Sequence, residues 1–105
     1  MPFVNDLERD IHFKKHGLKV GAADSLAYER MADSFMFDSL TLTMRECLRA
    51  NNTDRLRYND SNRRFGVACR VPEYVKTFYL VPMHTVNHHG GHPGYFAHEC
   101  ARTDL

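Results

Sequence analysis

The chain has 105 residues, of which 43% are hydrophobic and 26% are charged, and its formal net charge is +1 at pH 7. This length suits a single domain over residues 1–105 with a sizeable core, and the composition excludes a disordered chain. The first 20 residues contain no long apolar run, so we expect no signal peptide and no membrane-spanning helix there. Three cysteines without a CxxC pair predict reduced thiols in a cytoplasmic protein: Cys47, Cys69 and Cys100.

The first predicted element is a helix within residues 1–17. Its acidic side chains come early and its basic ones late, which is the order that the helix dipole favours. Gly17 suits the position just past the end of a helix whose last turn carries Lys14, Lys15 and His16. His12 lies four residues before His16 and shares its face, but this pair has no third ligand nearby and does not predict a metal site.

The second predicted element is an amphipathic helix over residues 24–37. Asp24 or Ser25 is suited to cap its start. The helical period is the clearest in the chain, and we expect this stripe to be buried against a sheet: Tyr28, Met31, Ala32, Phe35 and Met36.

Residues 40–82 change to a period of two and predict a sheet. Short polar breaks near residues 50–54, 60–62 and 71–73 divide this region into four strands, which favours an antiparallel meander with the second helix covering one face. Residues 83–105 hold five of the seven histidines, and the glycine and proline pairs at 90–91 and 93–94 predict an irregular tail. The expected fold is therefore α+β, with two N-terminal helices packed on a four-stranded antiparallel sheet and an irregular His-rich C-terminal tail.

The predicted sheet carries polar residues that suit RNA. Between positions 51 and 79 there are six basic residues and three acidic ones, a local surplus that could hold a polyanion. Alternation places Arg55, Arg57 and Asn59 on one face, and we expect Thr77 and Tyr79 to share it. Together with His16, Lys14 and Lys15, these residues supply the parts for metal-free RNA cleavage: histidine moves protons, and the cations hold the phosphate.

This order of elements, with Arg-x-Arg-Tyr-Asn at 55–59 and Lys-Thr-Phe-Tyr at 76–79, resembles the bacterial toxin ribonucleases of the barnase, EndoU, colicin and RelE superfamily. Over residues 13–82 it is most similar to the colicin D-like tRNA anticodon nucleases. The resemblance implies a metal-independent endoribonuclease of bacterial or phage origin that acts on RNA, with tRNA as the substrate of the nearest relatives. It further implies a 2′,3′-cyclic phosphate product, no cofactor, no membrane association, and a cognate antitoxin or immunity protein as partner.

The resemblance also assigns roles to individual residues. The proton-transfer histidine falls on His16, its lysine neighbour on Lys15 or Lys14, and the basic strand residue on Arg57. The final-strand pattern of a hydroxyl residue, any residue and an aromatic falls on Thr77 and Tyr79. Substrate binding is expected from Lys14, Arg55 and Asn59.

Two alternatives remain open from the residues alone. The same basic sheet could belong to a non-catalytic module that binds RNA or a protein. The tail could instead hold zinc through side chains with suitable chemistry but no fixed motif: His88, His89, His92, His98 and Cys100.

Overall fold

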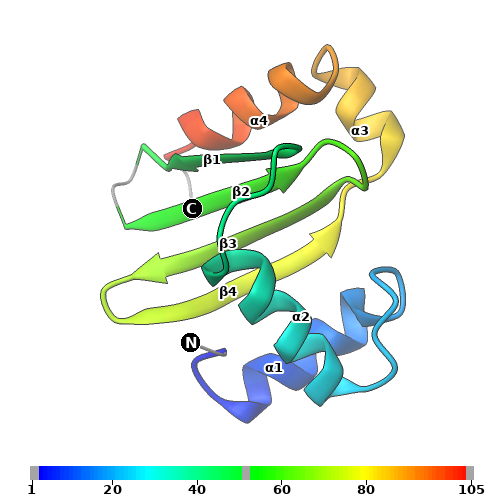
Figure 1. Ribbon diagram of the computed structural model, residues 1–105, viewed down its shortest axis with the longest axis vertical. Coiled ribbons are helices and arrows are strands. Elements are labelled where there is room, and N and C mark those ends of the chain that lie inside the picture. Colours follow the sequence, from blue (N-terminus) through cyan, green and yellow to red (C-terminus); the bar gives the residue numbers. More distant parts are fainter. Residues whose placement is uncertain (1–2, 51–52, 104–105) are drawn as a thin grey trace.

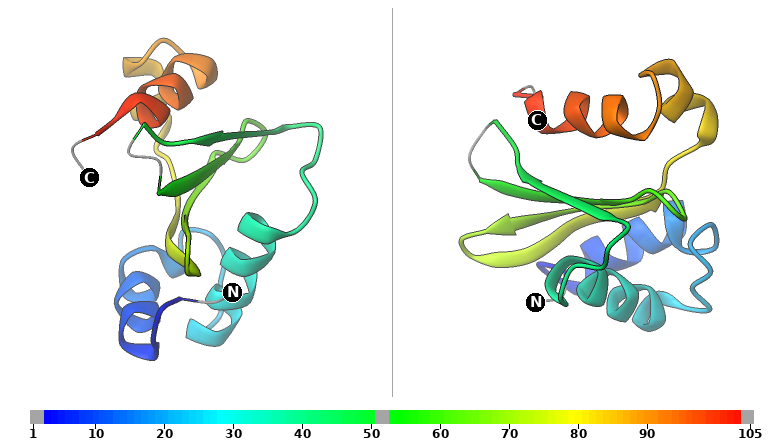
Figure 2. Two further views of the ribbon diagram at one scale, coloured as in Figure 1. Left: turned by 90° about the vertical axis from the view of Figure 1, so that its left-hand side faces the viewer. Right: turned by 45° about the horizontal axis from the view of Figure 1, so that its top comes forward.

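The computed structural model describes residues 3–50 and 53–103, and it is an α+β fold in which helices cover both faces of a four-stranded sheet. In Figure 2, α1 and α2 lie on one side of the sheet, and α3 and α4 lie on the other. The predicted coverage of one face by the second helix is correct, and the helices of the tail cover the other face, which was not predicted from the sequence. The reason is that the central strands carry large apolar side chains on the second face as well, including Leu56, Tyr58 and Phe65.

The first predicted helix is present and changes its winding near its end. α1 spans Asp6–His12 and begins with the Asn5 side chain accepting a hydrogen bond from the Glu8 backbone at 2.8 Å. It continues into η1, a π-helical segment over Phe13–Gly17. Gly17 is the last residue of η1 and not the residue past the helix end, contrary to expectation. It is buried, and a Cβ at this position would lie 2.1 Å from the Phe13 ring, which would have to move.

The second predicted helix, α2, spans Ser25–Phe37, and Asp24 is its cap, accepting from the Ala27 backbone at 2.7 Å. The predicted burial of its stripe is correct for Tyr28, Ala32 and Met36, which are fully buried. Met31 and Phe35 are only half-buried at the border of the same core.

The four predicted strands form the expected antiparallel meander in the order β1-β2-β3-β4 (Figure 1). Their bounds are Met44–Leu48, Asp54–Asn59, Arg64–Arg70 and Glu73–Leu80. A β-bulge lies between β3 and β4, where the pairing shifts between Val67 and Ala68. The bulge matters for the site below because it changes which β4 side chains share a face.

The tail is not irregular, contrary to expectation. It forms α3 over Met83–His88 and α4 over His92–Ala101. Gly90 and Gly91 have positive φ and make only the break between the two helices. α4 is helical because it buries Tyr95 and Phe96 against the second face of the sheet.

Two of the cysteines are joined, which corrects the expectation of reduced thiols. A disulfide links Cys47 in β1 to Cys100 in α4, whereas Cys69 is free. The bond ties the last helix to an edge strand of the sheet. None of the described helices combines the length and the apolar character needed to cross a membrane.

Candidate functional site

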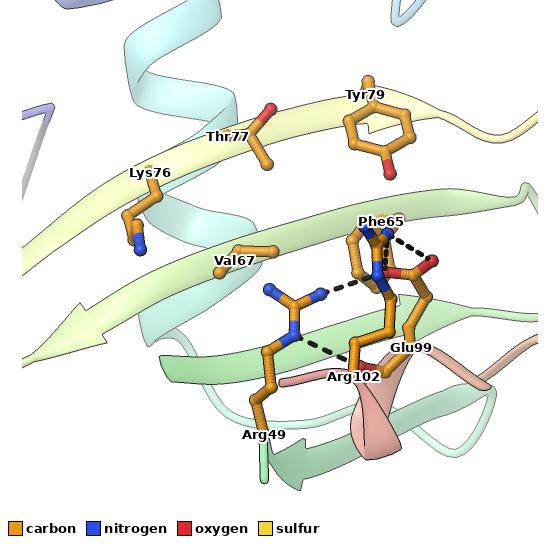
Figure 3. Close-up of a pocket in the computed structure, with 8 residues that line it drawn as sticks. All are labelled: Arg49, Phe65, Val67, Lys76, Thr77, Tyr79, Glu99 and Arg102. Atoms are coloured by element: carbon orange, nitrogen blue, oxygen red, sulfur yellow. Dashed lines mark hydrogen bonds and ion pairs between the residues drawn. The ribbon is translucent and has the colours of Figure 1, made fainter. Parts of the chain in front are cut away.

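A pocket of about 380 Å³ lies over β3, between β4 and the end of α4 (Figure 3). Its floor is apolar and its walls are polar and charged. The lining side chains are Arg49, Phe65, Val67, Lys76, Thr77, Tyr79, Glu99 and Arg102.

Strand register explains why Thr77 and Tyr79 meet in this pocket. Residues paired directly across neighbouring strands point to the same face of a sheet. Tyr79 pairs with Phe65, and Thr77 pairs with Val67, so all four side chains lie on the α4 face. The bulge leaves Lys76 as the extra residue of β4, and its side chain also lines the pocket.

His16 contacts Tyr79, one of the pocket residues, from the other side of the sheet. The end of η1 packs on the edge strand β4, and the His16 ring lies 5.2 Å from the Tyr79 ring, centroid to centroid. His16 is half-buried, while Lys14 and Lys15 beside it are exposed. Of the predicted site residues, Thr77 and Tyr79 line the pocket, and His16 contacts Tyr79 without itself lining the pocket. Lys14 and Lys15 lie in the same π-helical segment as His16.

The surroundings of these two rings set their protonation states at neutral pH. Burial lowers the pKa of His16, and His12, Lys15 and Lys19 lower it further, so the imidazole is neutral at pH 7 and able to accept a proton. Burial raises the pKa of Tyr79, against a smaller opposing effect of Tyr95, so its phenol keeps its proton.

A chain of alternating charges forms one wall of the pocket. Lys76 Nζ lies 3.2 Å from the Asp54 carboxylate, and Arg49 Nη1 lies 3.7 Å from the same group. Arg49 also donates from Nη2 to Glu99 Oε1 at 2.9 Å and from Nε to the Glu99 carbonyl at 3.1 Å. Arg102 Nη1 lies 3.3 Å from Glu99 Oε2. The pocket thus contains three cations, each near a carboxylate.

Arg57 is not part of this arrangement, and the expectation that it shares a face with Thr77 and Tyr79 is wrong. It pairs with Gly66 and so points to the α2 face. There it is 7% exposed and donates to Glu46 at 2.7 Å and to the carbonyls of Phe35 and Asp38 at the end of α2. These contacts describe a helix-capping side chain.

The other two predicted strand residues also lie away from the pocket. Arg55 is on the α2 face with Arg57, 3.7 Å from Glu46. The Asn59 side chain accepts hydrogen bonds from the backbone and hydroxyl of Ser61 and so stabilises a turn. Neither Arg55 nor Asn59 is close to His16 through any contact in the described structure.

Of the eight pocket residues, only Thr77 and Tyr79 were named as site residues from the sequence, and the four charged ones were missed: Arg49, Lys76, Glu99 and Arg102. Arg49 lies next to a predicted turn, and Glu99 and Arg102 lie in the predicted tail, so no periodicity pointed to them. Lys76 belongs to the Lys-Thr-Phe-Tyr segment noted from the sequence, and a bulge is what turns it into the pocket.

The tail histidines do not gather as ligands. Among the residues that the structure describes, no group of three or more His, Cys, Asp or Glu side chains is placed to hold a metal ion. His92 instead makes a 2.6 Å hydrogen bond with the Tyr58 hydroxyl, and the rings of His89 and His98 stack 4.2 Å apart. Cys100 is in the disulfide.

Comparison with known proteins adds no further evidence: no family model, curated protein or solved structure matches this chain.

Proposed function

We propose that this chain is a metal-independent endoribonuclease that cleaves RNA through attack by the substrate's own 2′-oxygen. One observation carries the proposal. His16, whose pKa is lowered by burial, lies against Tyr79, and Tyr79 lines a pocket together with Thr77 and Lys76. A neutral histidine in contact with a protonated phenol, and a cation in the same pocket as that phenol, are the groups that this reaction needs.

Each group has a role in the proposed reaction. His16 takes the proton of the 2′-hydroxyl, and the 2′-oxygen attacks phosphorus. The bond to the 5′-oxygen breaks as Tyr79 gives that oxygen its proton, and His16 then returns a proton to Tyr79. Lys76 and Lys15 stabilise the charge on the phosphate, and the Thr77 hydroxyl hydrogen-bonds the substrate. The products are a 2′,3′-cyclic phosphate and a 5′-hydroxyl.

The resemblance to toxin ribonucleases extends the proposal beyond the site. It supports tRNA as substrate, a cognate antitoxin or immunity protein as partner, the arrangement of that superfamily for the fold, and the cytoplasm as the place of action. The disulfide adds an oxidising compartment to the proposal, because such bonds form there. A toxin that crosses an oxidising compartment before it reaches tRNA accounts for both the disulfide and the cytoplasmic place of action.

The decisive experiment incubates tRNA and a single-stranded RNA with the protein, with and without EDTA, under both oxidising and reducing conditions. We expect cleavage in EDTA and a 2′,3′-cyclic phosphate end. His16→Ala should lower the rate by about 100- to 10,000-fold, the usual contribution of one acid–base residue. His84→Ala is the matched control, because His84 is exposed on α3. Loss of activity in EDTA, a 5′-phosphate product, or an active His16→Ala variant would refute the mechanism.

A second candidate is a module that binds RNA or a protein without cleavage. It is favoured by the pairing of Arg49, Lys76 and Arg102 with carboxylates, which resembles a stable structural network more than a poised site. RNA affinity with no cleavage in either redox state would support it. Each phosphate that a single strand places on the protein should then add about 0.7 to the slope of log affinity against log salt.

A further inference from the structure

The disulfide lies directly beside the charged wall of the pocket. Cys47 is two residues before Arg49, and Cys100 immediately follows Glu99. The two segments also meet through a backbone hydrogen bond of 2.9 Å from Ala50 to the Cys100 carbonyl. The disulfide therefore adds a covalent link to the direct hydrogen bonds that hold Glu99 against Arg49.

Glu99 occupies the position that an anionic ligand would take. Its carboxylate accepts from Arg49 at 2.9 Å and faces Arg102 at 3.3 Å, so two guanidinium groups hold one anion (Figure 3). Guanidinium groups bind phosphate oxygens in the same way. Glu99 is 6% exposed and Arg49 is 3% exposed, so no external phosphate can reach Arg49 while Glu99 stays in place.

We propose that the pocket is a phosphate site blocked by the chain's own Glu99, and that reduction of the Cys47–Cys100 disulfide opens it. The oxidised chain is latent, and the reduced chain accepts an RNA phosphate at Arg49 and Lys76. These two cations already converge, since both contact Asp54. The substrate part of this inference rests on the proposed function, whereas the blocked anion site does not.

The chemistry of opening is a thiol–disulfide exchange. A dithiol gives two electrons and two protons, the bond between the cysteine sulfurs breaks, Cys47 and Cys100 become thiols, and the reductant leaves as its own disulfide. Both cysteines are half-buried and therefore partly accessible. The reduced helix keeps its anchors Tyr95 and Phe96 in the core, so reduction removes the covalent constraint only from its last turn. Glu99 is then held against Arg49 by its hydrogen bonds to that side chain, for which a phosphate can compete.

The test measures binding of inorganic phosphate to the oxidised and the dithiol-reduced chain by calorimetry. We expect reduction to tighten phosphate binding by about 10- to 100-fold, the range expected for one additional charge-assisted hydrogen bond. The Cys47→Ser/Cys100→Ser double variant should bind like the reduced chain under oxidising conditions. Cys69→Ser is the matched control and should still respond to reduction, because Cys69 is the free cysteine.

A second variant tests the proposal independently, so that the test does not depend on the folding of the double cysteine variant. Glu99→Ala keeps the disulfide but removes the blocking side chain and its charge, so it should tighten phosphate binding in the oxidised chain. Equal or weaker phosphate binding after reduction, or no change in oxidised Glu99→Ala, would overturn the proposal.

Parallel RNA cleavage assays separate the two hypotheses. Phosphate binding that tightens on reduction without RNA cleavage in either state would refute the nuclease and support the switch. RNA cleavage at equal rates in both states, with unchanged phosphate binding, would refute the switch and support the nuclease.

Discussion

Replacing Arg57 with alanine should damage the fold rather than the chemistry. Arg57 is 7% exposed and donates to two carbonyl oxygens at the end of α2, those of Phe35 and Asp38. It also donates to Glu46 at 2.7 Å. The variant leaves these three acceptors at the end of α2 and on β1 without their donor. It also removes the hydrogen bonds by which Arg57 joins β2 to the end of α2.

The expected magnitude follows from these contacts. Each carbonyl that loses its donor costs about 1 kcal/mol. The bond to Glu46 contributes about 1 kcal/mol more, since the Glu46 side chain is 30% exposed and water screens its charge. Arg57→Ala should therefore lower the free energy of unfolding by about 2 to 4 kcal/mol, which corresponds to a loss of roughly 10 to 20 °C in Tm for a domain of this size.

Urea unfolding followed by circular dichroism measures this change, with a constant m value as the sign that only stability has changed. Arg55→Ala is the control on the same strand. Arg55 is 28% exposed and lies 3.7 Å from Glu46, so its loss should cost less than about 1 kcal/mol. An Arg57→Ala variant that is as stable as the wild type but inactive on RNA would refute the reasoning and indicate that Arg57 acts on the substrate.

Two further predictions concern stability. Burial lowers the pKa values of His12 and His16, so the unfolded chain binds more protons than the folded chain just below pH 6.5. Stability should therefore fall as pH drops from 7 to 5 in urea titrations, and a His12→Gln/His16→Gln variant should lose part of that dependence; an unchanged dependence would contradict the pKa shifts. Gly66→Ala would place a Cβ 2.6 Å from Met36 Sδ, and such overpacking should cost about 1 to 3 kcal/mol in the same assay. A loss below about 0.5 kcal/mol would show that α2 packs less closely on β3.

The sequence by itself determined the local elements. The helical stripe from Tyr28 to Met36 specified α2, and the change to a period of two specified four strands, because both patterns follow from how side chains repeat along one element. The meander followed as well, since short turns leave antiparallel neighbours as the only connection. The position of His16 near the end of the first helix could also be predicted, because helix ends are marked by local sequence.

The tertiary structure alone decided which side chains share a face and which segments meet. Register sets Arg57 against α2 and Tyr79 toward α4, and one bulged residue, Lys76, is enough to change the composition of the pocket. The tail became helical because burial of Tyr95 and Phe96 outweighed its glycines. Cys47 and Cys100 are 53 residues apart, and no spacing rule predicts their pairing, because a disulfide depends on proximity in space and not on distance along the chain.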